Sequence, residues 1–118
     1  MTNTQLIASG NSKRLYNRVS ETLGIPNLDS FYRLFLIPGM EHCLGGQGAW
    51  AFGQGSVESA IVNSTSHNIL LALVDWVENG NAPESIIGSI PGNSTADREH
   101  CRYPQRTVWN GTAWTCVV

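Results

Sequence analysis

The sequence predicts an α/β fold class, in which these 118 residues form the last third of a larger domain and end in a β-hairpin. Segments with apolar residues at helical spacing alternate with short strand-like runs, as they do in α/β domains. Only one run has the character of a central strand, and a sheet built from it alone would leave bare edges and an uncovered hydrophobic helix. An Asn-Gly pair between two strand-like runs near the C-terminus indicates the hairpin.

The first expected element is a helix that Asn11 or Ser12 caps and that runs to about Leu23. Gly24 suits the left-handed position that follows a helix, and Pro26 prevents any continuation. Four apolar residues recur at helical spacing and make one face of this helix, namely Leu15, Tyr16, Val19 and Leu23.

A buried strand is expected over 31–37, which is aromatic and aliphatic and ends at Pro38-Gly39. A short apolar run of this kind is typical of a strand that is covered on both faces. Six glycines lie between Gly39 and Gly55, so this stretch is expected to be a long loop. Loops in this position commonly carry functional residues.

A second helix is expected over 68–78, with Gly80 at its end. Because it is apolar on most sides, we expect it to be well covered by other elements. A short strand over 86–90 should follow. The C-terminal hairpin is then expected to pair 106–109 with 112–116 across the Asn-Gly turn.

The chain contains three cysteines, so one must be left over if the others form a disulfide. Cys101 and Cys116 flank the expected hairpin and are the natural pair. Closing a loop of that length would stabilise the fold by roughly 3 kcal/mol in the chain-entropy model. Cys43 is then either a buried free thiol or a residue whose partner lies outside this chain.

Charge and hydropathy exclude two classes of partner. The net charge is −2, and no basic stripe is available to neutralise phosphates, so nucleic-acid binding is not expected. The longest apolar run, 69–74, is far too short to span a membrane. Only 14% of the residues are charged, against about 25% in typical proteins, and Asn, Ser, Thr and Gly replace them.

Three sequons indicate a secreted glycoprotein, with Asn63, Asn93 and Asn110 as the expected glycosylation sites. The cysteines, with Cys101 and Cys116 as a natural pair, also favour an oxidising compartment. Residues 1–5 have neither the basic nor the apolar region of a signal peptide. A secreted protein should have one, and we therefore expect the true N-terminus to lie upstream of this chain.

His42 is the candidate catalytic residue, because it follows the expected strand and the Pro38-Gly39 turn in a glycine-rich loop. In α/β-hydrolases the general-base histidine lies on a loop after a late strand, and it is the last triad member along the chain. A neutral imidazole near pH 7 can accept the serine proton and return it to the leaving group. By spacing alone, a surface or packing role for His42 remains open.

Two His-Cys pairs, His42-Cys43 and His100-Cys101, raise the question of a metal site. Structural zinc ligands are usually spaced as Cys-x₂₋₄-Cys or His-x₃₋₅-His, and adjacent ligands have poor geometry. We therefore predict no metal and no cofactor. His67, at the start of the second expected helix, is interpreted as a helix-end or packing residue.

The block from Phe31 to Ala49 resembles the C-terminal block of the tannase and feruloyl esterase family. Members typically have Phe-Tyr-Arg-Leu-Phe, followed by Pro-Gly-Met-x-His-Cys-x-Gly-Gly-x-Gly-Ala. Further segments on both sides resemble the neighbouring blocks of the family, namely Leu6-Ile7 to Tyr16 with Val19, Asp75–Gly80 with Ala82-Pro83, Cys101–Gln105, and Cys116-Val117.

The resemblance implies that 1–118 is the C-terminal part of an α/β-hydrolase domain of a serine carboxylic ester hydrolase. It gives His42 the role of the triad histidine. It also implies that Cys43 bonds a cysteine beside the nucleophilic serine, which would lie upstream in the missing N-terminal part of the same domain. The substrate class implied is a phenolic ester, either a small molecule or one linked to a polysaccharide.

Two departures from the family pattern matter for activity. The Gly-Cys-Ser-x-Gly-Gly type motif of the nucleophile does not occur, and Thr4 stands where the triad Asp is usual, with Asn3 beside it. Asp29 and Asp75 are candidates by residue type only. The chain alone is therefore expected to be inactive, because loss of the nucleophile removes most of the catalysis. The alternative function is a non-catalytic secreted remnant or binding protein.

Overall fold

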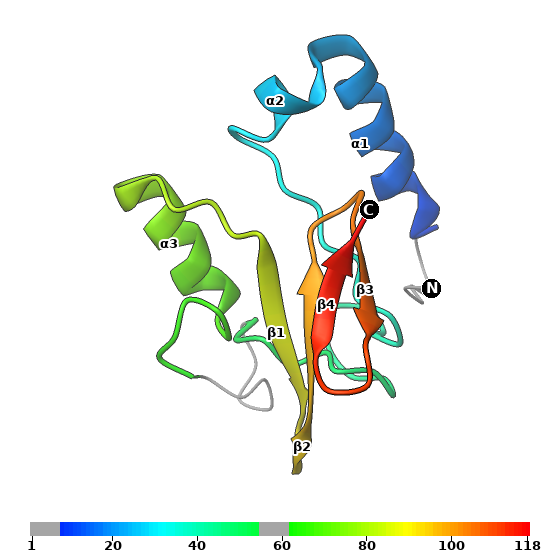
Figure 1. Ribbon diagram of the computed structural model, residues 1–118, viewed down its shortest axis with the longest axis vertical. Helices are drawn as coiled ribbons and strands as arrows, with labels where there is room; N and C mark the ends of the chain where they lie inside the picture. Colours follow the sequence, from blue (N-terminus) through cyan, green and yellow to red (C-terminus); the bar gives the residue numbers. More distant parts are fainter. Residues whose placement is uncertain (1–7, 55–61) are drawn as a thin grey trace.

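The computed structural model describes residues 8–54 and 62–118 (Figure 1). Its elements, in chain order, are α1 (Gly10–Leu23), α2 (Ile25–Leu28), α3 (Ile69–Asn79), β1 (Ser85–Ile90), β2 (Asn93–Cys101), β3 (Arg106–Trp109) and β4 (Trp114–Val117). In Figure 1, the β1–β2 hairpin is central, with α3 on one side and the β3–β4 hairpin on the other. No helix in the described ranges has the length and apolarity needed to cross a membrane.

The antiparallel pair β1–β2 is the longest ladder in the described part of the chain. Ser85 pairs with Cys101 at one end and Ile90 pairs with Asn93 at the other, with an irregularity after Gly88. The short strand expected at 86–90 is confirmed as β1. Its isoleucines suit a pleated, half-buried surface, which explains why this stretch forms a strand. The expected elements did not include β2, since its sequence Asn-Ser-Thr-Ala-Asp-Arg-Glu-His-Cys has almost no apolar character.

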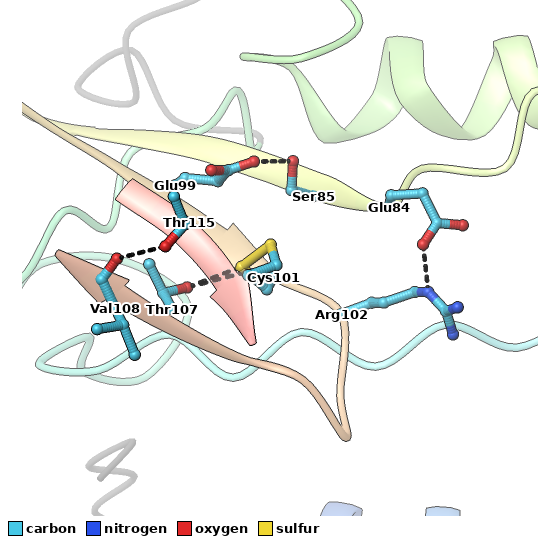
Figure 2. Close-up of a disulfide and its surroundings, with 9 residues drawn as sticks. Glu84, Ser85, Glu99, Cys101, Arg102, Thr107, Val108 and Thr115 are labelled. Carbon is cyan, nitrogen blue, oxygen red and sulfur yellow. Dashed lines mark hydrogen bonds and ion pairs between the residues drawn. A yellow bond between two sulfur atoms is a disulfide. The ribbon is translucent and has the colours of Figure 1, made fainter. Parts of the chain in front are cut away.

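The C-terminal hairpin is confirmed as the pair β3–β4. The second strand begins at Trp114 and not at the expected 112, because the Asn110 side chain accepts hydrogen bonds from the backbone N–H groups of Thr112 and Ala113. These bonds hold the residues in a turn. The predicted disulfide is also confirmed, since Cys101 is bonded to Cys116 and joins β4 to β2 (Figure 2).

The expected buried strand over 31–37 is wrong. Only Phe35 forms a bridge, to Arg102, and one further backbone bond runs from Tyr103 N–H to the Leu34 carbonyl, at 2.7 Å. Phe31 is 61% exposed, although Ile37 at the other end is buried. A strand requires a neighbouring edge for its N–H and C=O groups, and within the described residues the backbone of 31–37 pairs with no named strand, only with Arg102 and Tyr103 just after β2.

Two boundaries in the first helical region also differ from expectation. The helix α1 begins at Gly10 after Ser9, which makes no capping bond with its side chain, and not at Asn11 or Ser12. Gly24 has a positive φ of 77° but a ψ of 145°, so it is not the left-handed residue expected. Pro26 does not stop helical structure, because it lies in the first turn of α2, where its missing N–H is harmless.

The helix α3 begins and ends one residue later than the expected 68–78, with Gly80 at its end as expected, but its burial differs. The Asn68 side chain caps it by accepting from the N–H groups of Leu70 and Leu71, and Gly80 ends it in the left-handed conformation. Its only buried residue is Ala72. The other apolar side chains form an uncovered face, with Leu70 61%, Leu73 52%, Val74 40% and Val77 76% exposed. The prediction of a well-covered helix is therefore wrong for the part of the chain that the structure describes.

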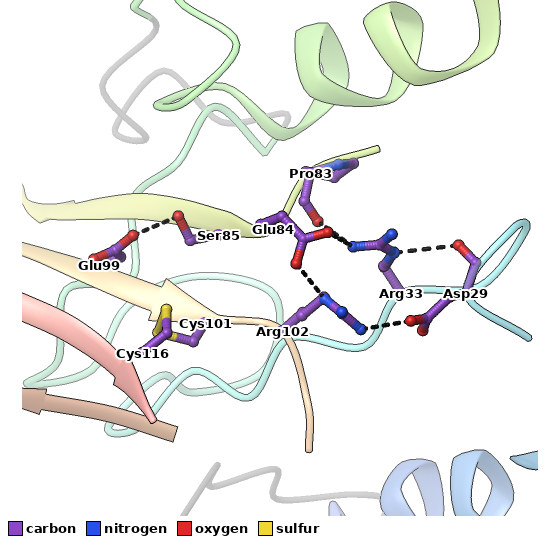
Figure 3. Close-up of polar contacts among 9 residues, drawn as sticks. All are labelled: Asp29, Arg33, Pro83, Glu84, Ser85, Glu99, Cys101, Arg102 and Cys116. Carbon is purple, nitrogen blue, oxygen red and sulfur yellow. Dashed lines mark hydrogen bonds and ion pairs between the residues drawn. A yellow bond between two sulfur atoms is a disulfide. The ribbon is translucent and has the colours of Figure 1, made fainter. Parts of the chain in front are cut away.

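A network of ion pairs joins the segment after α2 to the ends of β1 and β2 (Figure 3). Arg102 contacts Asp29 at 2.8 Å and Glu84 at 2.5 Å, and Arg33 contacts Glu84 at 2.6 Å. Arg33 also donates to the carbonyl oxygens of Asp29 and Pro83. The hydrogen bond from Arg33 lowers the pKa of Glu84 below its ordinary 4.5. Because both arginines are mostly buried, the network holds 29–33 firmly against the hairpin.

Candidate active site

The glycine-rich segment that contains His42 forms a narrow loop with two limbs. The first limb is 39–41, the second is 45–51, and the residues between them form the tip. Gly48 N–H donates to the Gly39 carbonyl and Glu41 N–H donates to the Gly45 carbonyl, each at 3.1 Å. Met40 and Gly46 form an antiparallel bridge between the two limbs. The loop expected from the glycine content is thus confirmed over 39–54, while Gly55 lies outside the described residues. Its limbs are joined by backbone bonds, which places His42 at a defined tip.

Glycine is required where the two limbs meet. Gly39 has φ +75°, and a Cβ there would stand 2.8 Å from the Gly48 nitrogen. Gly46 has φ +102°, and a Cβ there would fall on the Gly39 carbonyl oxygen. Both positions combine a left-handed backbone with a close approach, which L-residues with side chains do not tolerate. The glycines therefore serve the pairing of the limbs and do not make the loop loose.

The tip of the loop is a tight three-residue turn centred on Cys43. Leu44 N–H donates to the His42 carbonyl at 2.9 Å, and Cys43 has φ 67° although it is not a glycine. A positive φ at the centre of such a turn is strained for a residue with a side chain. Strain of this kind persists only where the surroundings hold the backbone, and it is concentrated at functional sites. The side chains of His42 and Cys43 are both exposed at this tip.

The Gln54 side chain is hydrogen-bonded to the tip of the loop, and no sequence pattern had indicated this residue. Its side-chain nitrogen donates to the carbonyl oxygens of Trp50, at 2.5 Å, and Cys43, at 3.4 Å. Its side-chain oxygen accepts from Phe52 N–H at 2.8 Å. One carboxamide thus connects the strained turn to the buried stretch that follows the loop.

The second limb is anchored to the outer edge of β1. Ala51 exchanges two backbone hydrogen bonds with Ser89, at 2.9 and 3.0 Å. The Ala49 carbonyl contacts His100 Nε2 on β2 at 2.7 Å. The Ala49 carbonyl and His100 come together beside Gly88. A Cβ at Gly88 would fall on the Ala49 oxygen and lie 2.8 Å from the imidazole, so this position requires glycine. The three residues 49–51 are all buried, so the loop ends in the core of the described structure.

His100 is almost wholly buried, with 1% of its surface exposed. The Ala49 carbonyl can only accept, so Nε2 carries the hydrogen, and Nδ1 has no partner among the described residues. Burial lowers the pKa of His100 below its ordinary 6.5, with a smaller opposing contribution from the Ala49 bond and a smaller lowering from nearby Arg98. The lowered pKa favours the neutral imidazole, and the bond to Ala49 fixes its hydrogen on Nε2.

Within 8–54 and 62–118, neither aspartate that was a candidate for the triad acid is hydrogen-bonded to His42. Asp29 is paired with Arg102, and Asp75 accepts hydrogen bonds from the side chains of Asn79 and Asn81. Asn3 and Thr4, which stand near the usual place of the acid, lie outside the described residues. No hydrogen bond of His42 to a carboxylate or a serine occurs in the described part of the chain.

The remaining histidine and cysteine candidates do not form a catalytic or metal site among the described residues. His67 Nδ1 lies 2.9 Å from the Ser66 hydroxyl just before α3. Cys43 is exposed and unpaired among the described residues, so it is not the buried thiol that was one of its two alternatives. Glu99 lies near Cys101 and Cys116, but these sulfurs are bonded to each other and offer no thiolate to a metal.

Comparison with known proteins gives one consistent match. The family model "Tannase and feruloyl esterase" matches residues 4–117. A probable feruloyl esterase B-2 of Aspergillus terreus is 46% identical over 128 residues, which cover 97% of this chain and 24% of the relative. The chain therefore spans about a quarter of the length of the curated relatives that it matches.

Solved structures agree with this match. Feruloyl esterase B from Aspergillus oryzae superimposes with a TM-score of 0.85 at 39% identity, over 97% of this chain and 25% of that one. A tannin acyl hydrolase from Aspergillus niger superimposes with a TM-score of 0.70 at 25% identity, over 98% of this chain and 21% of that one. The helices and hairpins described above are thus similar to one portion of each of these enzymes.

The neutral, buried His100 predicts that the stability of this chain depends on pH. The unfolded state takes up a proton as the pH falls below 6.5, whereas the folded state resists it because the folded pKa is lower. The contribution of His100 to the free energy of unfolding should therefore be fully present well above pH 6.5 and decrease as the pH falls below that value. Urea unfolding from about pH 7.5 to about pH 5.5 measures this. His100→Gln should flatten the dependence, and an equal slope in that variant would contradict the assignment.

Proposed function

The chain belongs to the tannase and feruloyl esterase family, and from this membership we propose that it supplies the general-base histidine of a serine carboxylic ester hydrolase. His42 has that role. The observation that carries the proposal is the geometry of the tip, where an exposed imidazole stands beside a strained cysteine on a loop anchored at its base. A base held in this way is positioned before substrate arrives, which is what proton transfer in a triad requires.

In the proposed reaction, His42 accepts the proton of a serine hydroxyl while the serine oxygen bonds to the ester carbonyl carbon. The imidazolium then gives the proton to the oxygen of the departing alcohol, which leaves an acyl-enzyme. Water repeats the sequence, with His42 again as the base, and releases the acid. The serine, the carboxylate that orients His42, and the oxyanion donors would come from the remaining part of the domain.

The substrate class that we propose is a phenolic ester, either a small molecule or one attached to a polysaccharide. This follows from the relatives, which are called feruloyl esterases and tannin acyl hydrolase. Because the chain covers 24% of such a relative, the activity belongs to the complete domain and not to these residues alone.

A non-catalytic binding protein is the second candidate function. It is favoured by one observation, namely that no serine or carboxylate is hydrogen-bonded to His42 in the described part of the chain. The two candidates differ in what happens when the remainder of a related domain is restored around the loop.

We propose a chimera of this chain with feruloyl esterase B from Aspergillus oryzae, in which the chain replaces the matching quarter. The chimera should hydrolyse a feruloyl ester, and His42→Gln should lower kcat by at least about 10⁴-fold, because the general base is lost. Steady-state kinetics on purified, folded protein measures this.

The matched control for that experiment is His67→Gln, which removes another histidine of the same chain outside the loop and should leave the activity in place. The isolated 118-residue chain should show no hydrolysis above background. A folded but inactive chimera would favour the binding protein, and turnover by the isolated chain would contradict our account of the missing residues.

We also propose that Cys43 forms a disulfide with a cysteine beside the nucleophilic serine, outside this chain. Its exposure and the turn beside His42 support this pairing, because the bond would tie two triad members together. Peptide mapping of the chimera without reduction should show Cys43 bonded to a cysteine of the other part. Cys43→Ala should release one reactive thiol, whereas a free Cys43 in the chimera would exclude the pairing.

We propose that the complete protein is secreted and glycosylated at Asn63, Asn93 and Asn110, all of which lie in exposed positions. Expression through a eukaryotic secretory pathway should give a protein whose mass falls when N-glycans are removed enzymatically. Replacing each asparagine by Gln should remove one glycan at a time. A secreted product with no change in mass would be evidence against all three sites.

A further inference from the structure

We propose that His100 is a positioning residue for catalysis, which fixes the loop of His42 through a single hydrogen bond to the Ala49 carbonyl. The proposal rests on the proposed function of His42. His100 does not touch the reacting atoms in it, and it acts by holding the base of the loop on β2.

The contact has the features of a built support. The Nε2–Ala49 distance is 2.7 Å, and both residues are buried, with 1% and 4% of their surfaces exposed. A buried carbonyl needs a donor, and the imidazole is the donor that reaches it across the gap left by Gly88. Without His100, no side-chain donor among the described residues satisfies this oxygen.

Histidine is a costly choice for this position if it only fills space. Its Nδ1 is buried and without a partner in the described structure, and an unsatisfied polar atom in a core is unfavourable. An aliphatic side chain would avoid that cost, but it would leave the buried Ala49 carbonyl without a donor. The bond is therefore the property that distinguishes His100 from an ordinary core residue.

Ala49 is well placed to transmit this support to the tip. It lies in a tight turn closed by Trp50 N–H and the Gly48 carbonyl, at 3.0 Å. Gly48 N–H in turn bonds the Gly39 carbonyl on the first limb. A shift of Ala49 therefore displaces both limbs, and with them the turn that carries His42. A displacement of about 1 Å at a catalytic group can lower the rate about 10²-fold.

The test uses the active chimera described above and two variants of His100. His100→Leu keeps an apolar volume but removes the donor, so kcat per titrated active site should fall by roughly 10- to 100-fold with little change in KM. His100→Gln retains an amide N–H that can reach the same carbonyl, and it should restore most of that loss. Active-site titration removes the effect of unfolded protein from both values.

The matched control is Ile86→Ala, which alters the cross-strand partner of His100. Ile86 is also 1% exposed, so its truncation should lower the melting temperature while kcat per titrated site is retained. An equal loss of kcat in Ile86→Ala and His100→Leu would overturn the proposal, because the effect would then be general destabilisation. An equal loss in His100→Gln and His100→Leu would also overturn it.

Hydrogen exchange separates this inference from the proposed function. In His100→Leu, the amides of 48–51 should exchange faster relative to those of β1 and β2 in the same variant, and they should not do so in Ile86→Ala. If the chimera is folded but inactive, the proposed function fails, and with it the catalytic role of His100. Unchanged relative exchange in His100→Leu, in an active chimera, would overturn the inference alone.

Discussion

The antiparallel pairing of β1 with β2 is the constraint on which the rest of the described structure depends. One edge of β1 holds β2, and the other receives Ser66 and Ala51 through backbone hydrogen bonds. The end of β2 is bonded to the C-terminal hairpin through Cys101 and Cys116, and Arg102 just beyond it anchors the segment after α2. Because all these contacts are made to the β1–β2 hairpin or to the residue just after it, this hairpin joins the separate local elements into one frame.

This frame explains how a glycine-rich loop can present a histidine with precision. Loops are usually mobile because their backbone groups face water. Here the two limbs bond each other, Gln54 supports the tip, and Ala49 and Ala51 attach to the hairpin. The exposed His42 is thus the end of a chain of backbone contacts that begins in the core. For the general base that we propose His42 to be, such preorganisation matters more than the flexibility that the glycines suggest.

The exposed apolar face of α3 and the missing partners of 31–37 have a common explanation in the length of the relatives. The chain corresponds to about a quarter of them. An α/β domain covers its helices and strands with neighbours that are distant in sequence, and here these would belong to the remaining three quarters. In the proposed function, the serine and the carboxylate that His42 lacks among the described residues would also belong to those three quarters.

The sequence by itself determined the features that depend on local chemistry. These are the ends of α3 at Asn68 and Gly80, the Asn-Gly hairpin, the Cys101–Cys116 pair, the loop and the family. Only the tertiary structure decided which segments find partners. It paired the polar strand β2, left 31–37 with one bridge, and brought Gln54 and His100 to the loop. Capping and turn preferences operate over a few residues, whereas burial and strand pairing depend on neighbours that no local pattern specifies.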